Sequence, residues 1–460
     1  MKIIPYGGAK RVTGNCFYVE VRDLKLLIDC GMFQGEDEGK NYEGFTFDPK
    51  GIDYLILTHA HIDHCGRIPL LVREGFRGKI ICTEPTAKLS RLMLLDASKV
   101  MYETYKASFK KLLRAGKSPK PPLYEEYDVF EALEYFKVIL PYNEDYKLSK
   151  GVIIRLRDAG HILGSSFVEM EVYEDKKPKR IIFSGDLGNK NKPIVHDPEM
   201  PSAADYVFIE STYGDRNHKS FQESKEELLE AIRYTIGRGG NVIIPSYALE
   251  RAQEILYVLR EFYEEGRLPK CNIFLDSPLA ISITRLFLSH PEFYDKETYK
   301  VFLQRNPFEL PNLHFTKEVE ESKAINSVSS GAIIIAGSGM LNGGRVLHHL
   351  KYNLWREECS IVFVGYQPRG TLGRKIIDGA ERVRIFSEDI EVRAKIFTIN
   401  GFSSHADQEG LLEWLSFTQK PKRVFLIHGE EEKMKIFGNA IKSHLNFDWY
   451  IPKEGEPISL

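Results

Sequence analysis

The chain has 460 residues, of which 43% are hydrophobic and 28% are charged. This composition excludes a disordered chain, and the length predicts two or three domains, because a single core seldom grows beyond about 250–300 residues. The 63 basic and 65 acidic residues leave a net charge of only −2, so any polyanionic partner must be held by a local patch.

The first two hundred residues predict a β-rich region, because short apolar or alternating runs are bounded there by Gly, Pro and Asp. Between about residues 85 and 136 the pattern changes to long helices. Residues 117–122 (Lys-Ser-Pro-Lys-Pro-Pro) interrupt them, since proline removes a donor and blocks a helix. The strands that we expect are 24–29, 54–58, 79–82, 152–157, 167–172, 180–184 and 206–210.

From about residue 220, buried strands alternate with amphipathic helices, a pattern that predicts a doubly wound parallel sheet. A further strand–helix–strand piece follows residue 395 and ends in the strand 424–427. In this half of the chain we expect strands at 242–245, 273–275, 333–336 and 360–364, and helices at 249–265, 279–288 and 344–355.

Two windows of the chain are rich in basic residues. Residues 99–120 hold seven Lys or Arg against one acid, Glu103, and residues 345–375 hold six against Glu357 and Glu358. Each window is either a surface for a polyanion or a solvated helix face. The basic residues are Lys99, Lys106, Lys110, Lys111, Arg114, Lys117 and Lys120 in the first window, and Arg345, Lys351, Arg356, Arg369, Arg374 and Lys375 in the second.

The segment Thr-His-Ala-His-Ile-Asp-His-Cys-Gly at 58–66 directly follows an apolar strand. His59 and His61 are two residues apart on an extended chain and therefore point the same way, toward one metal ion. Asp63 and His64 come where the chain turns toward a helix, so they face a second ion. Imidazole and carboxylate without thiolate suit zinc in a hydrolytic site. Four potential ligands in six residues are not a core pattern, since buried His and Asp are costly unless they are satisfied.

Further ligands are expected at strand ends later in the chain. His161 lies between two strands and is flanked by glycines, Asp186 follows the strand 180–184, and His428 follows the strand 424–427. A carboxylate at Asp186 can bridge two ions. Alone, each of these residues is more often a cap or an otherwise satisfied polar group; together with segment 58–66 they predict a metal site.

The order of these motifs resembles the metallo-β-lactamase superfamily, and more narrowly its β-CASP branch of RNA- and DNA-processing nucleases. The resemblance covers essentially the whole chain and is nearest to prokaryotic homologues of the endonuclease subunit of pre-mRNA 3′-end cleavage. Many superfamily hydrolases share the first four motifs, whereas the last three select the nucleases. The motifs are, in order, Asp29, the segment 59–64, His161 and Asp186, then Glu210, His405 and His428.

The resemblance implies an α/β fold: an αββα metallo-β-lactamase sandwich built from residues 1–209 and 395–460, with an inserted doubly wound β-CASP domain at 210–394. The zinc site is expected in the cleft between them, where a flexible single strand can enter. The implied ligands are His59, His61, His161 and Asp186 for the first Zn²⁺, and Asp63, His64, Asp186 and His428 for the second.

The resemblance also implies catalytic roles for Asp29, Asp186, Glu210 and His405. Asp29 would orient the metal loop without binding an ion. A hydroxide bridging the two zinc ions would be the nucleophile. His405 would protonate the leaving alkoxide, and Glu210 would hold its imidazole protonated. The alternative for His405 is an N-cap of the helix 408–417, a task that Ser403 or Ser404 could perform instead.

Glycine-rich segments at 336–344 and 369–374 are candidate phosphate cradles, with tight turns as the alternative. Their candidate substrate-binding residues are Ser338, Gly370, Thr371 and Arg374. The remaining histidines are expected to be structural; they are His196, His218, His290, His314, His348, His349 and His444.

These observations predict a zinc-dependent ribonuclease that cuts single-stranded RNA to leave 5′-phosphate and 3′-hydroxyl ends. The alternatives are a DNA nuclease of the same branch, a thioester or lactam hydrolase, and a non-catalytic scaffold. The insert of nearly two hundred residues argues against the small-molecule hydrolase, and the intact ligand set argues against the scaffold. The sequence does not distinguish an endonuclease from a 5′→3′ exonuclease, or a homodimer from a monomer.

Six scattered cysteines, none in a CxxC pair, predict reduced thiols and not a disulfide frame. The N-terminus lacks the apolar core of a signal peptide. No apolar run approaches the roughly 18 residues of a membrane span. We therefore expect a cytoplasmic protein without a membrane partner.

Overall fold

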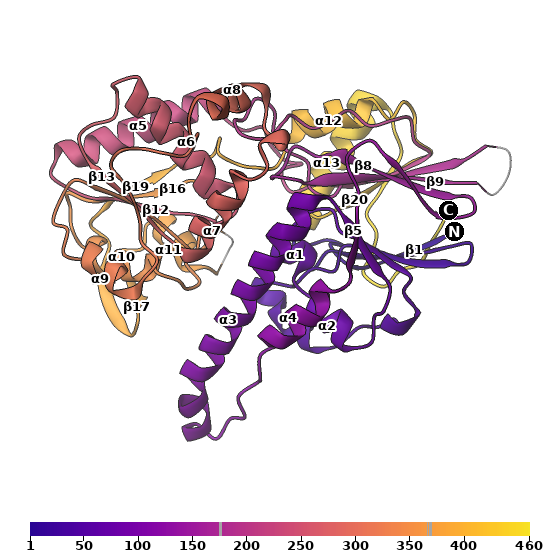
Figure 1. Ribbon diagram of the computed structural model, residues 1–460, viewed down its shortest axis with the longest axis horizontal. Helices are drawn as coiled ribbons and strands as arrows, with labels where there is room; N and C mark the ends of the chain where they lie inside the picture. Colours follow the sequence, from indigo (N-terminus) through magenta and orange to yellow (C-terminus); the bar gives the residue numbers. More distant parts are fainter. Residues whose placement is uncertain (174–176, 366, 368–369) are drawn as a thin grey trace. The chain divides into compact units, whose positions relative to one another are not determined.

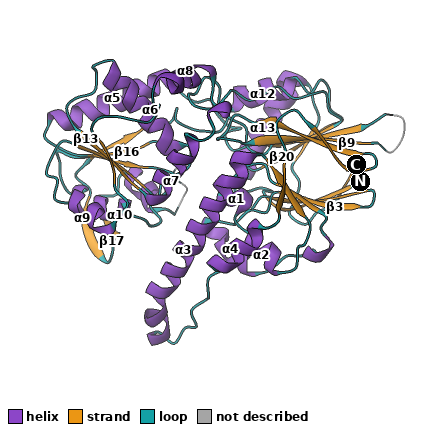
Figure 2. Cartoon of the chain, in the orientation of Figure 1, coloured by secondary structure: helices purple, strands orange, loops and turns teal. Residues whose placement is uncertain are grey.

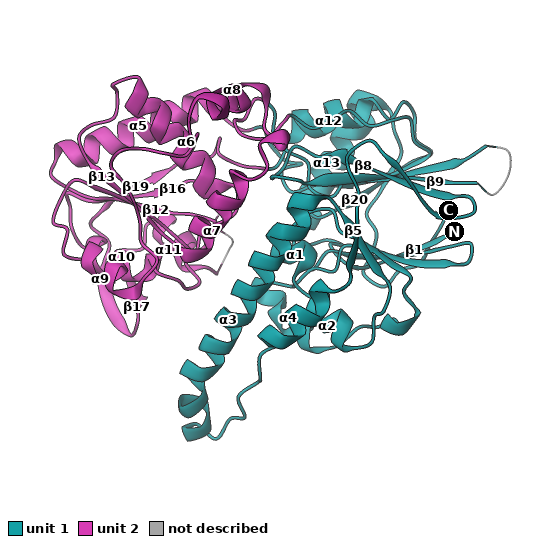
Figure 3. Ribbon diagram, in the orientation of Figure 1, with its two compact units in different colours: residues 1–190, 197–217, 405–460 teal, residues 191–196, 218–404 magenta. Residues whose placement is uncertain are grey.

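The computed structural model describes residues 1–173, 177–365, 367 and 370–460, and the chain divides into two compact units (Figures 1 and 3). Unit 1 comprises Met1–Lys190, Asp197–Asn217 and His405–Leu460. Unit 2 comprises Asn191–His196 and His218–Ser404. The chain therefore leaves unit 1 twice, at residues 191–196 and 218–404, whereas the sequence predicted one insertion at 210–394.

The first sheet of unit 1 carries the N-terminal strands. Its central strands β3, β4, β5 and β6 are parallel, whereas β1 is antiparallel to both β2 and β22. In order across the sheet the strands are β22 (Ile458–Ser459), β1 (Lys2–Gly7), β2 (Cys16–Val21), β3 (Leu24–Ile28), β4 (Tyr54–Ile56), β5 (Lys79–Cys82) and β6 (Phe136–Ile139).

The second sheet of unit 1 joins an antiparallel meander to parallel strands. Strands β7 to β10 run antiparallel, and β10, β11, β20 and β21 run parallel. In order across the sheet the strands are β21 (Trp449–Tyr450), β20 (Arg423–Ile427), β11 (Tyr206–Glu210), β10 (Lys179–Phe183), β9 (Ser166–Val172), β8 (Val152–Asp158) and β7 (Asp145–Ser149).

Successive side chains of these strands point to opposite faces of each sheet, and the buried ones form three apolar layers. On the first sheet Leu26 faces the core between the sheets and Leu27 faces the outer helices; on the second, Phe208 and Val207 divide in the same way. The layers therefore stack as helix, sheet, sheet, helix, and the expected αββα arrangement is confirmed (Figure 2). The helices of unit 1 are α1 (Ile62–Cys65), α2 (Ile68–Arg73), α3 (Glu84–Arg114), α4 (Glu126–Leu133), α12 (Gln408–Ser416) and α13 (Glu431–Leu445).

Unit 2 is built on a parallel sheet, as the alternation of buried strands and helices predicts. In Figure 2, α5 and α6 cover one face of it and α9 and α10 cover the other. The strands, in order across the sheet, are β14 (Leu313–Phe315), β13 (Asn272–Asp276), β15 (Ala332–Ala336), β12 (Val242–Pro245), β16 (Ser360–Phe363) and β19 (Lys395–Thr398), and a separate hairpin joins β17 (Arg382–Ile385) to β18 (Glu388–Glu391).

Along the chain, α5 precedes the first strand of unit 2, β12, and the other helices of this unit lie between β12 and β19. Ser277 caps α7 through its hydroxyl and Pro278 occupies the first turn, a combination that favours a helix start. The helices are α5 (Phe221–Gly237), α6 (Arg251–Glu264), α7 (Pro278–Phe287), α8 (Lys296–Gln304), α9 (Val319–Ile325), α10 (Val346–Asn353) and α11 (Leu372–Ile377).

One strand belongs to a different unit from the one that its position in the sequence suggested. Residues 395–398 were expected in the second part of the sandwich, but β19 pairs in parallel with β16 and extends the sheet of unit 2. A strand of four half-exposed residues carries too little apolar pattern to indicate which sheet it joins. The return to unit 1 comes at His405.

None of the helices in the described part of the chain has both the length and the apolar character that a membrane crossing needs. The six cysteines are buried and free, in agreement with the expected reduced thiols.

Candidate metal centre

The carboxyl ends of parallel strands in both sheets of unit 1 carry the residues of the candidate site. In the first sheet Asp29 follows β3 and the segment 59–64 follows β4, its parallel neighbour. In the second sheet Asp186 follows β10, Glu210 ends β11 and His428 follows β20. Ligand sites commonly form at this edge of parallel strands. The fold therefore brings together residues that are up to 399 positions apart, from Asp29 to His428.

His161 reaches the same edge by a different route. It lies in the turn between β8 and β9, which are antiparallel, and its backbone N–H donates to Ser165 Oγ at 3.0 Å. The carboxylate of Asp158 accepts from the backbone N–H of Gly160 at 2.8 Å and holds the start of this turn. The flanking Gly160 and Gly164 adopt positive φ, which explains why glycines surround this histidine.

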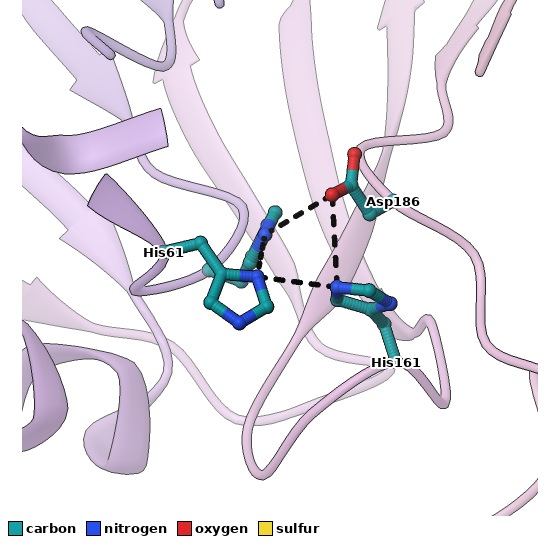
Figure 4. Close-up of side chains that lie close together, drawn as sticks. His61, His161 and Asp186 are labelled. Atoms are coloured by element: carbon teal, nitrogen blue, oxygen red, sulfur yellow. Dashed lines mark hydrogen bonds and ion pairs between the residues drawn. The ribbon is translucent and has the colours of Figure 1, made fainter. Parts of the chain in front are cut away.

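A first group of side chains converges on one point (Figure 4). Nδ1 of His61 lies 3.1 Å from Nε2 of His59 and 3.2 Å from Nε2 of His161. Oδ2 of Asp186 lies 3.4 Å from Nε2 of His59 and 3.6 Å from Nε2 of His161. A tetrahedral ion with bonds of about 2.0–2.1 Å separates its ligand atoms by roughly 3.3 Å. These four residues therefore fit a metal ion without rearrangement.

A second group lies on the other side of the same carboxylate. Oδ1 of Asp186 is 3.2 Å from Nε2 of His64 and 3.6 Å from Nε2 of His428. Oδ2 of Asp63 is 3.8 Å and 4.0 Å from the same two nitrogens, so this group is more open. Asp186 Oδ1 is buried without a hydrogen-bond donor among the described residues. Such an atom is costly unless a cation or donor satisfies it.

The histidines of the first group are held neutral. Burial and the neighbouring imidazoles lower the pKa of His59 and of His61 to about 3, and the same causes hold the pKa of His161 well below its usual range. Neutral imidazole is the form that binds a metal ion. The pKa values therefore agree with the geometry.

Charge is concentrated in the second group. Burial opposes the ionisation of Asp186, but His428, His64 and His59 outweigh it and hold the pKa of this carboxyl well below its usual range. For His64 burial is outweighed by Asp186 and Asp29, which raise its pKa well above the usual value. Asp186 is thus an anion at neutral pH, as a bridging ligand must be.

Asp29 contacts this group from outside it. Its Oδ1 accepts from the Thr58 backbone N–H at 2.8 Å, and its Oδ2 accepts from the Thr58 hydroxyl at 2.9 Å. Oδ2 also lies 2.7 Å from Nδ1 of His64. A proton held on Nδ1 leaves Nε2 of His64 free for a metal ion, and this is how such outer partners fix a ligand's tautomer.

The chain packs so tightly beside this loop that one position requires glycine. A Cβ at Gly31 would lie 1.6 Å from the carbonyl oxygen of Asp63. The N–H groups of Cys30 and Asn15 also donate to this segment, at 2.8 Å to His64 O and 2.9 Å to Asp63 O. The loop after β3 and the residue before β2 therefore fix the backbone that carries Asp63 and His64.

Asn15 is a site residue that the sequence did not reveal. Its side-chain amide is buried and lies 2.9 Å from Nε2 of His64 and 2.5 Å from Nδ1 of His428. Rotation of the amide presents either its oxygen or its nitrogen, so it can set which nitrogen of His428 carries the proton. No local signal marks Asn15, because it precedes β2 by one residue and reaches the site only through the pairing of β1 with β2.

His405 lies beside the two groups with its ring anchored by Glu210. Nδ1 of His405 is 3.0 Å and 3.2 Å from the two carboxylate oxygens of Glu210, while Nε2 is 4.0 Å from Asp186 Oδ2. Burial favours the neutral ring, but Glu210 outweighs it and raises the pKa of His405 to about 9. His405 therefore presents a protonated Nε2 toward the cluster.

Glu210 is itself held in place. It is fully buried and accepts from the backbone N–H of Leu187 at 2.8 Å. The chain around His405 is tied to the same segment, since the Ala406 N–H donates to Leu187 O at 2.7 Å. Asp407 is the N-cap of α12 and accepts from Gly410 N–H at 2.9 Å. The cap is therefore Asp407, and neither His405 nor Ser403 or Ser404 has that role.

The candidate substrate-binding residues all lie in unit 2 and have local contacts. Ser338 Oγ accepts from the Asn342 N–H at 3.1 Å and closes a turn. Thr371 caps α11 by accepting from the Arg374 N–H, and Arg374 pairs with Asp378 at 2.8 Å. Gly370 adopts a φ of 84°. These contacts agree with the tight-turn alternative, and substrate binding by these residues stays a prediction.

Three family models cover most of the chain. The model described as the metallo-β-lactamase superfamily matches residues 9–247, and the β-CASP domain model matches residues 252–376. The model described as a Zn-dependent metallo-hydrolase RNA specificity domain matches residues 389–452. The chain belongs to the metallo-β-lactamase superfamily. Within that superfamily the second match places it in the β-CASP branch, so the resemblance is confirmed.

Similar proteins agree with this placement. Ribonuclease TTHA0252 of Thermus thermophilus is 42% identical over 96% of both chains. An RNase J-like protein of Methanocaldococcus jannaschii is 32% identical over 98% of this chain and 97% of its own. Transcription termination factor FttA of the same organism is 30% identical, and this chain spans 70% of its length.

These family members confirm the expected class, a hydrolase of the superfamily's nuclease branch. Among solved structures, a protein of unknown function from Enterococcus faecalis V583 matches with a TM-score of 0.57 and 14% identity, covering 100% of this chain and 99% of its own. That likeness supports the fold alone. The His and Asp cluster could hold a metal ion, and the matching RNA specificity domain model is described as that of a Zn-dependent metallo-hydrolase.

Proposed function

We propose that this chain is a zinc-dependent ribonuclease that hydrolyses phosphodiester bonds of single-stranded RNA, with two zinc ions and with His405 as general acid. One observation carries the proposal. Each carboxylate oxygen of Asp186 lies among the imidazole nitrogens of a different ligand group, at 3.4–3.6 Å in the first and 3.2–3.6 Å in the second. One carboxylate thus lies between two candidate ligand groups, which supports two adjacent ions.

The donor set favours zinc. Imidazole nitrogens and carboxylate oxygens without thiolate, in a group with tetrahedral spacing, are typical ligands of zinc in hydrolytic sites. The first group would be His59, His61, His161 and Asp186, and the second Asp63, His64, Asp186 and His428. When bound, paired ions of this kind activate water and neutralise phosphoryl oxygens.

The protein's own contribution to bond cleavage would come from His405. Hydrolysis that leaves a 5′-phosphate expels the 3′ oxygen of the preceding nucleotide as an alkoxide, which is a poor leaving group at neutral pH. Nε2 of His405 would donate a proton to that oxygen while the P–O bond breaks. Glu210 keeps Nδ1 occupied, so that Nε2 is the nitrogen that faces the reaction. A positioned acid of this kind contributes roughly 10²–10⁴-fold to the rate.

RNA as the substrate is supported by the relatives. The C-terminal match is described as an RNA specificity domain, and the relative that is 42% identical is named a ribonuclease. Neither of these names states whether the RNA is single-stranded, how it is cut, or whether the protein forms a homodimer. A single-stranded substrate is therefore part of the proposal, and duplex RNA is the comparison that tests it.

The proposal is tested by metal content and by product analysis on the full chain. Elemental analysis of protein purified without added metal should find close to two zinc ions per chain. End-labelled single-stranded RNA should be cut, and matched DNA and duplex RNA should not. His444→Ala, at an exposed position on α13, is the control histidine and should change neither result. Full activity with one ion per chain, or faster cleavage of DNA than of RNA, would contradict the proposal.

A further inference from the structure

The second half of α3 is a long helical segment without a buried face. The helix spans Glu84–Arg114, and its buried residues all lie between Pro85 and Ser98. From residue 99 onward no side chain of this helix is buried. Sixteen residues at 1.5 Å each make a segment of about 24 Å. Figures 1 and 3 show the end of α3 extending away from the sheets of unit 1.

This segment carries positive charge that carboxylates do not neutralise. All seven basic residues of the window 99–120 are exposed, and none of them forms an ion pair with a described residue. Lys120 lies instead 5.0 Å from the ring centre of Tyr42. Unpaired cations at this density attract a polyanion.

The other basic window is different. Arg345 pairs with Asp276, Lys351 with Glu388, Arg356 with Glu358 and Arg374 with Asp378, at 2.6–2.8 Å. Arg369 lies outside the described residues. Four of the five described cations of this window therefore meet carboxylates of unit 2, and Lys375 is the exception. The structure thus favours the solvated-face alternative for residues 345–375, and the window on α3 is the stronger candidate for a polyanion.

Exposed apolar side chains lie next to the lysines along one side of α3. Tyr102, Phe109 and Leu113 are 50%, 36% and 53% exposed. At 100° per residue they fall within about 40° of one another around the helix, and Lys106 falls within about 60° of all three. Lys99 and Lys110 lie beside Lys106 along one edge of this stripe. Aromatic rings interleaved with lysines are the surface on which bases stack while phosphates are neutralised.

The start of the same helix is attached to the candidate metal centre. Thr83 Oγ1 and Thr86 Oγ1 donate to the carbonyl of Gly164 at 2.6 Å and 2.9 Å, and Gly164 closes the turn that carries His161. From Thr86 to Tyr102 the helix rises about 24 Å. A nucleic-acid strand spans that distance with about seven nucleotides at 3.4 Å each. The exposed stripe thus begins within a short strand's reach of the site.

We propose that the outer half of α3, residues 99–114 with Lys117 and Lys120, is an RNA-docking arm that holds single-stranded substrate beyond the cleavage site. This inference rests on the proposed function. An acidic protein partner would account for the lysines but not for the exposed rings among them. An anionic membrane would account for the lysines and the rings, but not for the attachment of α3 to the turn that carries His161.

The test compares a long and a short RNA in the full chain. Tyr102→Ala/Phe109→Ala removes both rings without changing charge. KM for an RNA of about twenty nucleotides should rise by roughly 5- to 150-fold for each ring that stacks a base. The kcat for that RNA should stay unchanged, as should both constants for an RNA of about four nucleotides. Val100→Ala is the matched control, because Val100 is 53% exposed and lies about 160° around the helix from Tyr102.

Charge is tested separately through the salt dependence of binding. Lys99→Glu/Lys106→Glu/Lys110→Glu should reduce the slope of log affinity against log salt by about 2, since each single-strand phosphate contact contributes about 0.7. Unchanged long-RNA KM and salt slope, in variants that melt like the parent, would overturn the arm while leaving the ribonuclease proposal intact. Equal losses on the short RNA would also overturn it.

Two other outcomes have a different meaning. If these changes abolish binding to phosphatidylserine vesicles and leave RNA binding unaffected, the surface is a membrane-binding one. A parent chain that cuts no RNA would instead contradict the proposed function.

Discussion

Each unit of this chain buries an aspartate among histidine and other polar side chains, and the two clusters differ in what completes them. Asp276, at the end of β13 in unit 2, accepts from Thr316 Oγ1 at 2.8 Å, Ser322 Oγ at 2.6 Å and Arg345 Nη1 at 2.7 Å, and His349 Nε2 lies 2.6 Å away. Asp186 in unit 1 lies instead among imidazole nitrogens, and its Oδ1 is without a hydrogen-bond donor among the residues described.

In the cluster around Asp276 each charge and donor has a partner. Burial opposes ionisation there, but His349, Ser322, Arg345 and Thr316 lower the pKa of Asp276 to about 2. The other ring nitrogen of His349 contacts Asn326 at 3.1 Å. In the first metal group, by contrast, the nitrogens of His59 and His161 face Nδ1 of His61. Three imidazole nitrogens that converge in this way, beside the carboxylate of Asp186, are arranged as ligands of a cation, whereas the aspartate of unit 2 is satisfied by protein donors.

Replacing the two aspartates should give the largest contrast. Asp186→Asn removes the anion shared by both ligand groups, so zinc content should fall at both positions and cleavage should drop to background. Asp276→Asn should leave metal content and cleavage of RNA close to the parent values. Elemental analysis and a cleavage assay on both variants measure this. Equal metal loss in the two would show that the spacing of ligand atoms does not distinguish a metal site from a structural cluster.

His405 lies close enough to the ligand groups to be either a metal ligand or a general acid, because its Nε2 is 4.0 Å from Oδ2 of Asp186. Replacing it distinguishes the two roles. His405→Ala should retain zinc and RNA binding while turnover falls by roughly 10²–10⁴-fold, the contribution of a general acid. His428→Ala should instead lose zinc. A substrate whose leaving oxygen is replaced by sulfur should restore turnover to His405→Ala only, since a thiolate leaves without protonation. Zinc loss in His405→Ala, or no rescue, would place His405 among the ligands.

The two clusters also differ in how clearly the sequence indicates them. The segment 59–64 was informative because four potential ligands in six residues fit no core pattern. His349 and Asp276 were not, because a histidine on a helix and an aspartate at a strand end occur in many folds. Asn15 stayed hidden for a related reason: its role depends on the pairing of β1 with β2, strands that the apolar pattern did not distinguish from their surroundings.

The bounds of several strands were predicted correctly, whereas the sheet that one strand joins was not. The strands at 79–82, 206–210 and 242–245 were predicted with the bounds that the structure has, since buried runs bounded by turn residues are strong signals. The sheet to which 395–398 belongs was predicted wrongly, because strand pairing over long sequence separations leaves no trace in a four-residue pattern. Local chemistry was thus easier to infer than the partners that tertiary structure supplies.

Asp29 allows a smaller test of how the metal cluster is supported. Asp29→Asn keeps the size of the side chain but weakens its contact with Nδ1 of His64, so the proton that frees Nε2 is held less firmly. Loss of such an outer partner typically costs 10- to 100-fold in metal affinity or activity. Titration with a competing chelator should show that loss, with the folded structure retained. An unchanged affinity would mean that the Thr58 contacts, and not the tautomer of His64, are what Asp29 provides.

The smallest effect is expected in the complete cluster of unit 2, and it concerns stability and not chemistry. The pKa of Asp276 is lowered from 3.8 to about 2 in the folded chain, so its ionised form stabilises the fold above pH 4 and this contribution is lost as the pH falls through about 2. The shift corresponds to about 2 kcal/mol, of which about 1 kcal/mol disappears between pH 6 and pH 3. Asp276→Asn cannot titrate. The difference in unfolding free energy between parent and variant should therefore shrink by about 1 kcal/mol over that range. Hydrogen exchange at the amides of β13 and β15 isolates unit 2 from acid release of metal in unit 1. A difference that stays constant from pH 6 to pH 3 would show that Asp276 acts through its hydrogen bonds alone, and the charge of this cluster would then not be what makes it complete.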